Sequence, residues 1–529
     1  MNRISSKITG AIKRSQLFLL FACCLIVPAL TTCSDYLDAR PENQILLDEF
    51  WLKESDVEAT VLACYRAMQE DGFIWRVITW GELRSDNVIT SQNADDNERE
   101  VSNANILATN GLCQWAAFYL VINYCNTVLQ YAPEVVEKDP DFTTADLQAK
   151  SAEALAIRAL CYFYLVRTFR DIPVPPEATI SDRQVLQIPQ SHPDTVLANI
   201  TNDLLQAEQW ALSEYMKDSK GRMTKDAIRA ILADVYLWRG KYTECIDYCD
   251  KLINATLATT ELSVTTPKYR LEEEMSSMLI FEEGNSSESI FELQFSTEKY
   301  NEGVGKLYGR ASDINGQLAA TVAYAEGEDV FPATDERKAD FIITTKTEGG
   351  TYPIFKYLGY RMGIGTNNMY LYKSTTANWI FYRITDVMLM KAEALVQLNR
   401  SDDDLKEALH IVNTTYMRAN PTLLESDTLA FANYSNPNAM ERLLLLERQR
   451  ELMFEGKRWF DLVRHSIRKN SSEDLVNYLM NKYTSNLSTI AAKLSVLNAL
   501  YLPIHTDELK VNPLLEQNPY YKTSSNIEK

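Results

Sequence analysis

The stretch 75–87 carries side chains of the kinds that hold a sugar. Aromatic rings stack on the C–H-rich faces of sugar rings, while Asn, Asp and Arg side chains hydrogen-bond the hydroxyl groups. A buried polar group that a ligand leaves unpaired costs about 1–3 kcal/mol, so each such group discriminates between ligands. The candidate ligand-binding residues here are Trp75, Trp80, Arg84, Asp86 and Asn87, with Tyr300 and Tyr308 further along the chain. Packing in the core is the alternative for each of these aromatic side chains.

A second stretch, 447–464, alternates acidic and basic residues among apolar ones. Three pairs would meet on a helix at i,i+3 or i,i+4 spacing: Glu447–Arg450, Asp461–Arg458 and Asp461–Lys457. Each acid has a basic neighbour that keeps it ionised, which favours structural ion pairs over a catalytic carboxylate. Gly456 divides the run and predicts two helices or one kinked helix.

Sequence motifs of common catalytic sites are absent. The chain has no phosphate-binding loop, nucleophile elbow or zincin helix. The four histidines lie far apart without the spacing of metal ligands: His192, His410, His465 and His505. Two carboxylates could hydrolyse a glycoside, but among 72 acidic residues no spacing singles out a pair. The sequence therefore predicts a binding protein without cofactor or metal, and not an enzyme.

The first 32 residues predict an export signal. Four basic residues, Arg3, Lys7, Lys13 and Arg14, precede an apolar run at 17–30 that is too short to span a bilayer comfortably. Cys33 follows this run where a lipoprotein would carry its acylated cysteine. Such an anchor is effectively permanent, since each buried methylene contributes ~0.8 kcal/mol. We predict cleavage before Cys33 and a single domain at 33–529; an ordinary signal peptide with an incidental cysteine is the alternative.

Charge and cysteine placement narrow the class of protein further. The net charge of −19 argues against a nucleic-acid partner, which would need a basic surface. Six later cysteines lie in apolar helical patterns and not at the spacings of a disulfide framework: Cys64, Cys113, Cys125, Cys161, Cys245 and Cys249. We expect them to be small buried hydrophobic residues.

Helical periodicity dominates the chain. Ser55 and Glu58 predict a capping box at the start of one helix, and further helices are expected at about 112–129 and 145–169. Two helix pairs are predicted at 225–254 and 384–417, the second with Ser401 as a helix cap. Paired amphipathic helices with small residues and short turns resemble tetratricopeptide units, here with interrupted spacing.

Two long segments, 72–111 and 260–380, lack this periodicity. The first is polar, and the second is rich in tyrosine and contains an alternating stretch at 289–295 that predicts a half-buried strand. Long irregular segments within a helical protein are often functional. We therefore predict a mainly α protein, a tetratricopeptide-like superhelix of helix pairs with a loop-rich, irregular second half packed on it.

The pattern E-R-x-R-E-L-x-F-E-G-x-R-W-x-D-L-x-R at 447–464 resembles the C-terminal signature of the SusD/RagB family. Similar matches occur at 158–166 and at 512–519, whereas Arg170 stands where the family commonly has Gly. The resemblance covers almost the whole chain after Cys33 and is weakest in the two irregular segments.

This resemblance implies a surface-exposed lipoprotein of the outer membrane. Such a protein takes part in polysaccharide utilization: it binds oligosaccharide or polysaccharide and delivers it to a SusC-like TonB-dependent transporter. The ligand site of the family is built from variable loops, so no ligand residue carries over by motif. Alternatives are a RagB-like protein that captures peptides, a scaffold of the transporter complex that binds no ligand, and a glycosidase.

Overall fold

The computed structural model describes residues 50–522, except 182–183, 185–186, 216–219, 258–265, 273–276, 311, 363–368 and 374. The predicted signal at 1–32 and the predicted acceptor Cys33 lie outside the described residues. Residues 53–529 form one compact unit, and Met1–Leu52 are assigned to another. The single domain expected at 33–529 stays a prediction, because residues 33–49 are not described.

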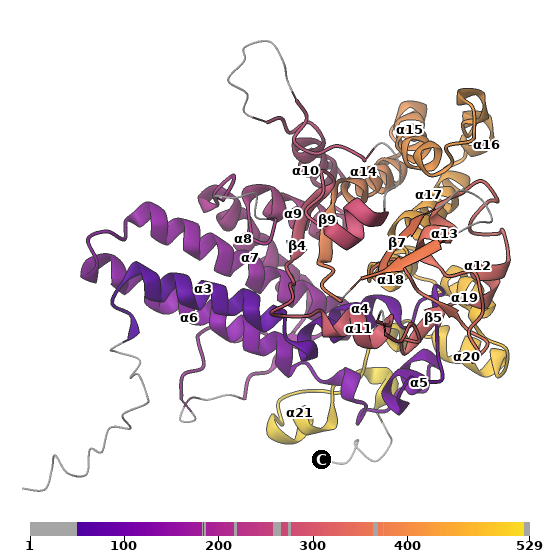
Figure 1. Cartoon of the computed structure of the whole chain (residues 1–529). Helices are drawn as coiled ribbons and strands as arrows, with labels where there is room; N and C mark the ends of the chain where they lie inside the picture. The colour runs from indigo at the N-terminus through magenta and orange to yellow at the C-terminus, as the bar shows by residue number, and fades with distance from the viewer. Residues whose placement is uncertain are drawn as a thin grey trace, which may run out of the picture. The chain divides into compact units, whose positions relative to one another are not determined.

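Helices that pack one against the next form the helical part of the larger unit. In chain order they are α3 (Glu54–Met68), α6 (Ala116–Lys138), α7 (Thr144–Phe169), α8 (Pro193–Trp210), α9 (Lys225–Trp238), α10 (Tyr242–Ile253), α14 (Ile384–Leu398), α15 (Asp402–Ala419) and α17 (Pro437–Leu452). They run from the indigo α3 to the orange α15 and α17 (Figure 1). This succession of paired helices confirms the predicted mainly α fold and the helix pairs at 225–254 and 384–417.

Small side chains and helix caps explain this packing. The alanines of α7 are buried between α6 and α8, where their short side chains let the neighbouring helices approach closely. Ser401 caps α15 as predicted, because its side chain accepts a hydrogen bond from the backbone N–H of Asp403. The predicted capping box at Ser55 and Glu58 is wrong: α3 begins at Glu54, and Asp56 accepts from the N–H of Lys53 at 2.9 Å.

The segment 72–111 is more regular than the sequence indicated. Its first part is the helix α4 (Asp71–Glu82), followed by β1 (Val88–Thr90), α5 (Asp96–Ser102) and the short 3-10 turn Gly111–Cys113. Most side chains of α4 are buried, including the polar Arg76 and Thr79, so the helix has no broad polar face toward solvent. The expectation of an irregular segment at 72–111 is therefore wrong for residues 72–82 and 96–102, which are helical.

The two segments predicted to be irregular meet in one antiparallel sheet. Strand β1 pairs with β5 (Leu318–Ala320), which pairs with β6 (Tyr352–Pro353). Short elements surround this sheet: α11 (Glu302–Leu307), α12 (Val322–Glu326), α13 (Arg337–Phe341), and the hairpin of β7 (Gly359–Met362) and β8 (Met369–Tyr372). The loop-rich second half thus shares a sheet with the chain that follows α4.

A buried two-stranded ribbon lies at the border of the helical part. Strand β4 (Ser289–Leu293) pairs antiparallel with β9 (Trp379–Arg383), and every residue of both strands is buried. The predicted strand at 289–295 is confirmed, but it is not half-buried as expected. Its alternating polar residue Glu292 is buried and accepts a hydrogen bond from Asn378 at 2.9 Å, so the polar positions face protein instead of water.

Shorter elements complete the described chain. They are the strands β2 (Ile172–Pro173) and β3 (Gln190–Ser191), a π-helix at Met278–Glu283, and α16 (Phe431–Tyr434), α18 (Arg458–Lys469), α19 (Glu473–Leu479), α20 (Leu487–Leu494) and α21 (Thr506–Val511). Short 3-10 turns lie at Glu425–Asp427, Met480–Lys482, Leu497–Leu500 and Pro519–Tyr521.

The stretch 447–464 forms two helices, as predicted. The helix α17 ends at Leu452, α18 begins at Arg458, and the turn between them holds Phe454 at φ 67° and Gly456 at φ 70°. The predicted pair of Glu447 and Arg450 is confirmed at 3.5 Å.

The two predicted pairs of Asp461 are wrong. Lys457 contacts Asp386 at 3.0 Å, and Arg458 contacts Asp86 at 2.8 Å. Asp461 pairs instead with Arg448 and Arg464, at 2.9 and 2.7 Å. Asp461 therefore has one partner at i,i+3 on its own helix and one on α17, while Lys457 and Arg458 pair with residues of other elements that the fold brings against the two helices.

Candidate ligand-binding site

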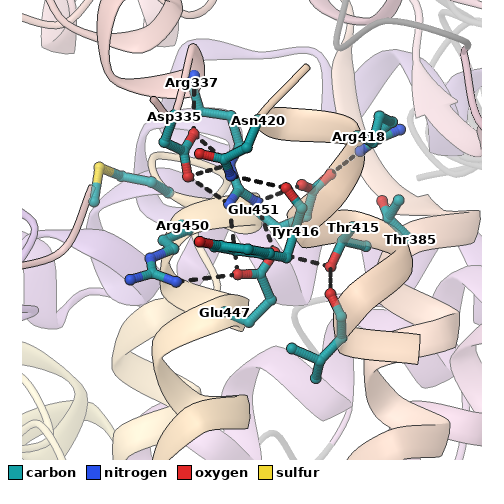
Figure 2. Close-up of polar contacts among 12 residues, drawn as sticks. Asp335, Arg337, Thr385, Thr415, Tyr416, Arg418, Asn420, Glu447, Arg450 and Glu451 are labelled. Atoms are coloured by element: carbon teal, nitrogen blue, oxygen red, sulfur yellow. Dashed lines mark hydrogen bonds and ion pairs between the residues drawn. The ribbon is translucent and has the colours of Figure 1, made fainter. Parts of the chain in front are cut away.

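The acidic residues of α17 lie in a buried network of ion pairs (Figure 2). Arg337 donates to Glu447 at 2.8 Å and to Glu451 at 2.9 Å, and it also pairs with Asp335. Burial alone would raise the pKa of Glu451, but Arg418, Arg383 and Arg337 outweigh it and lower the pKa. An ionised carboxylate held by several guanidinium groups is a structural element, as the sequence indicated.

Three of the predicted ligand residues are buried in the framework. The indole N–H of Trp80 donates to the carbonyl oxygen of Leu112 at 2.9 Å. Arg84 donates to the carbonyl oxygens of Leu500 and Ala499 at 2.7 and 2.6 Å. Tyr308 donates its hydroxyl to the carbonyl oxygen of Phe454 at 2.9 Å. Their polar groups already have protein partners, so we do not retain these residues as ligand contacts.

Asp86 and Asn87 are also buried and satisfied. Asp86 forms a two-point ion pair with Arg458, with distances of 2.8 and 2.9 Å. Burial would raise the pKa of Asp86, but Arg458 outweighs it and lowers the pKa. Asn87 donates to Glu82 at 2.7 Å and accepts from Gln449 at 2.9 Å. These residues join the end of α4 to α17 and α18, and they too are not retained.

The remaining two predicted residues reach the surface near α4 and α11. Trp75 is half-buried, and the ammonium nitrogen of Lys306 lies 4.1 Å from the centre of one of its rings. Tyr300, just before α11, is 41% exposed. Both stay predicted ligand contacts, although neither lines the cavity described next.

A cavity of about 720 Å³ opens beside β1. Its lining comes from four places in the chain: Ile89 and Thr90 of β1; Ser102, Asn103 and Asn105 at the end of α5; Val322 of α12; and Asn481, Lys482, Tyr483, Thr484, Ser485, Asn486, Thr489, Ile490 and Lys493 around α20. This volume lies within the range of about 300–1,000 Å³ that is typical of small-molecule sites.

Amide and hydroxyl groups dominate the lining. The side chains of Asn103, Asn481, Asn486 and Thr489 make no hydrogen bond to the residues that the structure describes, so their donors and acceptors are available to a ligand. Tyr483 is fixed in place because its hydroxyl donates to the carbonyl oxygen of Ser102 at 2.8 Å. Burial raises the pKa of Tyr483 to about 12, so its hydroxyl stays neutral at physiological pH.

Two lysines are the charged residues of the lining, and none of the described lining residues is acidic. Lys482 is buried and donates to the carbonyl oxygens of Leu83 and Ser85 at 2.7 and 3.1 Å. Burial lowers the pKa of Lys482 to about 7. Lys493 is half-buried and donates to the side-chain oxygen of Asn105 at 3.2 Å.

A second cavity of about 280 Å³ lies at the next residues of the chain after β1. Its lining is also polar: Ser91, Gln92, Asn93, Asn315, Thr347, Glu348, Gly349 and Thr351. Hydrogen bonds hold this wall in place, since Ser91 donates to the carbonyl oxygen of Gly316 at 2.6 Å and Asn93 to that of Asn315 at 2.7 Å. Because Thr90 and Ser91 are consecutive, the two cavities border the same short stretch of chain.

Sequence reasoning found one wall of this site and missed another. Residues 89–105 fall inside the polar segment 72–111 that was expected to be functional, but the candidates chosen there stop at Asn87, before the cavity begins. The wall at 481–493 was not singled out. Its signal was present, since 481–486 combine Asn, Lys, Tyr, Thr and Ser, the same mixture of one aromatic and several polar side chains.

Other possible sites contribute less. Within the described ranges, no group of three or more His, Cys, Asp or Glu side chains is arranged to hold a metal ion. No described helix combines the length and the apolar character of a membrane span. The six cysteines after Cys33 are buried, as predicted. They are free thiols in the structure, with the sulfur atoms of Cys64 and Cys125 3.8 Å apart.

Family models match both parts of the chain. A model of the SusD family matches residues 323–521, and a model described as starch-binding associating with outer membrane matches residues 35–237. SusD-like protein P38 of Formosa agariphila is 25% identical over 493 residues, which cover 85% of this chain and 92% of that protein. SusD-like protein P2 of the same organism is 26% identical and covers 83% of this chain and 89% of its own length.

Solved structures share the fold. A SusD superfamily protein from Bacteroides vulgatus superposes with a TM-score of 0.72 at 22% identity, covering 89% of this chain and 100% of the other. A SusD homolog from Bacteroides thetaiotaomicron also gives 0.72, at 20% identity, with 90% and 100% covered. The two family models together span more than half of the sequence, and the helical fold agrees with them: the chain belongs to the SusD family of nutrient-binding proteins.

Proposed function

We propose that this protein binds an oligosaccharide or polysaccharide segment in the 720 Å³ cavity and passes it to a SusC-like TonB-dependent transporter. Membership of the SusD family supports a role in nutrient binding. The observation that carries the choice of ligand is the lining of the cavity, where free amide and hydroxyl groups surround one fixed tyrosine.

This lining matches the chemistry of a sugar. Each sugar hydroxyl both donates and accepts hydrogen bonds, and an Asn amide or a Thr hydroxyl offers both functions to it. Asn103, Asn481 and Thr489 reach the cavity from separate elements, so they can contact different hydroxyls of one ligand. The ring of Tyr483 offers a surface for stacking on the apolar side of a sugar ring. Because Lys482 and Lys493 bring positive charge, the cavity is less suited to a basic peptide.

We further propose that the protein acts at the cell surface of the outer membrane, anchored through acylated Cys33. The model that matches residues 35–237 is described as associating with the outer membrane, which supports this location. A tether at Cys33 would hold the binding unit beside its transporter. The mechanism would then be capture and release, with no covalent change in the ligand.

The test is direct binding by the full-length chain, purified in detergent, against neutral and charged oligosaccharides and a peptide mixture. Isothermal titration calorimetry measures the affinity. We expect one class of oligosaccharide to bind, and Asn103→Ala and Thr489→Ala to weaken that binding by about fivefold each, the equivalent of one hydrogen bond of about 1 kcal/mol. Asn433→Ala, an exposed asparagine of α16 far from the cavity lining in sequence, is the matched control and should bind normally.

Three outcomes would contradict this assignment. Binding of peptides alone would favour the RagB-like alternative. Binding of a sugar that Trp75→Ala or Tyr300→Ala abolishes, with Asn103→Ala unchanged, would place the ligand near α11 instead. Absence of any ligand, alone or with the transporter present, would favour a scaffold of the transporter complex.

A further inference from the structure

We infer that the glycan held in the 720 Å³ cavity is anionic, carrying uronic acid carboxylates or sulfate esters that face Lys493 and Lys482. This inference rests on the proposed function and names the class of sugar that the same cavity takes. The charged residues that line the cavity are both lysines, whereas the protein as a whole carries a net negative charge.

Lys493 provides the accessible charge. It lies in α20, is half-buried at the cavity wall, and its ammonium group donates to an amide oxygen of Asn105. Within the described part of the chain it has no carboxylate partner, unlike lysines such as Lys457 and Lys391, which contact Asp or Glu side chains. A lysine in a polar cavity with only a neutral partner retains its capacity to pair with an anion.

Lys482 adds positive charge beneath the cavity floor. Its ammonium group is buried at the C-terminal end of α4, where two backbone carbonyl oxygens accept its hydrogen bonds. Asp86 makes no direct contact with it, since both oxygens of that carboxylate are bound by Arg458, but its negative charge favours the protonated form of Lys482. Burial and the neighbouring Arg84 lower the pKa of Lys482, and an anion in the cavity would favour its protonated form.

The nearby Glu82 is also occupied. It accepts hydrogen bonds from Asn87 and from the backbone N–H groups of Phe454 and Gly456. Burial raises the pKa of Glu82 to about 7, which reduces its negative charge at neutral pH. Glu82 and Asp86 are therefore bound to other groups. Lys493, which has no carboxylate partner among the described residues, is the main cation for a ligand, and Lys482 is partly protonated at neutral pH.

The net negative charge of the protein and the lysines of the cavity act on an anionic ligand in opposite directions. A net charge of −19 repels an anionic sugar at long range, but salt screens that repulsion over a distance of about 8 Å under physiological conditions. Inside the cavity, the nearest charged side chains determine the electrostatic interaction with a bound ligand. A neutral glycan can only accept a hydrogen bond from Lys493 through a hydroxyl group, whereas a carboxylate or sulfate also pairs with its charge and forms a stronger bond.

The experiment measures the affinity of the full-length chain for one neutral and two anionic oligosaccharides, and the salt dependence and the Lys493 variants separate the effect of charge from that of the sugar ring. The probes are maltoheptaose as the neutral sugar, an oligogalacturonate as the carboxylate form, and a carrageenan oligosaccharide as the sulfate form. Calorimetry at 50 and 300 mM NaCl gives the salt dependence. We expect an anionic probe to bind more tightly than maltoheptaose, with an affinity that falls as salt rises, and comparison of the two anionic probes identifies which group is recognised.

Variants of Lys493 test whether the preference for an anionic oligosaccharide arises in this cavity. Lys493→Gln should weaken binding of the anionic probe by about fivefold, the equivalent of an ion pair of about 1 kcal/mol, and Lys493→Arg should restore it. Lys510→Gln removes an exposed lysine of α21 that pairs with Asp507, and should leave binding unchanged. Circular dichroism verifies that each variant is folded.

The outcomes separate this inference from the proposed function. If maltoheptaose binds as well as both anionic probes and Lys493→Gln has no effect, the sugar is neutral: the proposed function stands and this inference fails. If poly-glutamate competes as well as an anionic sugar, the lysines recognise acidic peptides and the inference fails. If no oligosaccharide binds at all, both the proposed function and this inference fail.

Discussion

At the scale of single residues, Arg170 adopts a backbone conformation that glycine adopts more readily. It ends α7 with φ 71° and ψ −73°, and the N–H of Asp171 donates to the carbonyl oxygen of Phe169 at 3.0 Å across it. This is a γ-turn with a positive φ, a strained arrangement for a residue with a side chain. Its position is the one where the resemblance leads us to expect Gly, and the turn explains that preference physically.

Replacing this residue should therefore stabilise the protein. We predict that Arg170→Gly raises the free energy of unfolding by about 1 kcal/mol, because relief of backbone strain exceeds the added entropy of the unfolded chain. The two lost side-chain contacts, with Asp171 at 3.6 Å and with Asn498 at 3.4 Å, are long and partly exposed, so they contribute little. Urea denaturation measures the change. Arg239→Gly, at the end of α9 where φ is −78°, is the control and should destabilise.

The buried Asp386 at the start of α14 links stability to pH. Burial alone would raise its pKa, but Lys457 and Arg448 outweigh burial and lower the pKa to about 2. The folded pKa lies below the unfolded value, so the stabilisation is present above about pH 4 and is lost as pH falls toward 2. The shift corresponds to about 2 kcal/mol of stability.

We predict that Asp386→Asn lowers the free energy of unfolding at pH 7 by about 3–5 kcal/mol, since it leaves Lys457 without its carboxylate and Arg448 with Asp461 alone. The difference from the unmodified protein should shrink when denaturation is repeated at pH 3. Asp403→Asn, in an exposed pair with Lys406, is the control and should change stability by less than about 1 kcal/mol at either pH. An equal loss at both pH values would contradict the assigned linkage.

At the scale of elements, the crossing of α4 with the turn between α17 and α18 depends on glycine. A Cβ atom on Gly81 would lie 1.9 Å from the carbonyl oxygen of Gly456, a backbone atom that cannot rotate away. This close approach lets Glu82 accept hydrogen bonds from the backbone of Phe454 and Gly456. The helix and the turn therefore fit together only through a residue without a side chain.

The two glycines of α4 give a matched test. We predict that Gly81→Ala prevents folding or costs more than about 3 kcal/mol, because the turn must move away from the helix. At Gly72, in the first turn of the same helix, the nearest atom to an added Cβ is 3.6 Å away. Gly72→Ala should therefore be neutral or stabilise by up to about 1 kcal/mol. Thermal unfolding followed by circular dichroism distinguishes the two, and similar effects would refute this packing.

At the scale of the whole unit at 53–529, the buried ion network joins elements far apart in sequence. Glu451 of α17 contacts Arg337 of α13 at 2.9 Å and Arg383 of β9 at 2.7 Å, and it also pairs with Arg418 of α15. Figure 2 shows several of these side chains converging on Glu451. The network thus ties the helical pairs to the irregular second half.

Removing this shared carboxylate should affect the whole unit. We predict that Glu451→Gln lowers the free energy of unfolding by about 3–5 kcal/mol, since buried arginines would then face one another without their common partner. Glu407→Gln removes a half-exposed carboxylate of α15 that pairs with Lys391, and should cost less than about 1 kcal/mol. A comparable loss in the two variants would mean that the network contributes no more than a surface pair.

The sequence by itself determined the helical half and the family. Amphipathic periods and small residues specify the pairs α9–α10 and α14–α15 because these features are local, and Gly456 marked the break between two helices. The long charged pattern at 447–464 indicated structural ion pairs, which burial of Glu447 and Arg458 bears out. These patterns predict structure from the sequence alone because the residues that form each pattern lie within a few positions of one another.

Only the tertiary structure decided the burial of α4, the partners of Asp461 and the position of the cavity. Protein surrounds most of α4, so polar residues such as Arg76 and Thr79 are buried in it and do not mark a solvent-facing side in the sequence. Buried charges pair across elements, since each must find a partner wherever the fold brings one. The cavity joins residues near 90, 103 and 486, a convergence that no local pattern records, because the pairing of β1 with β5 and the packing of the C-terminal segment create it.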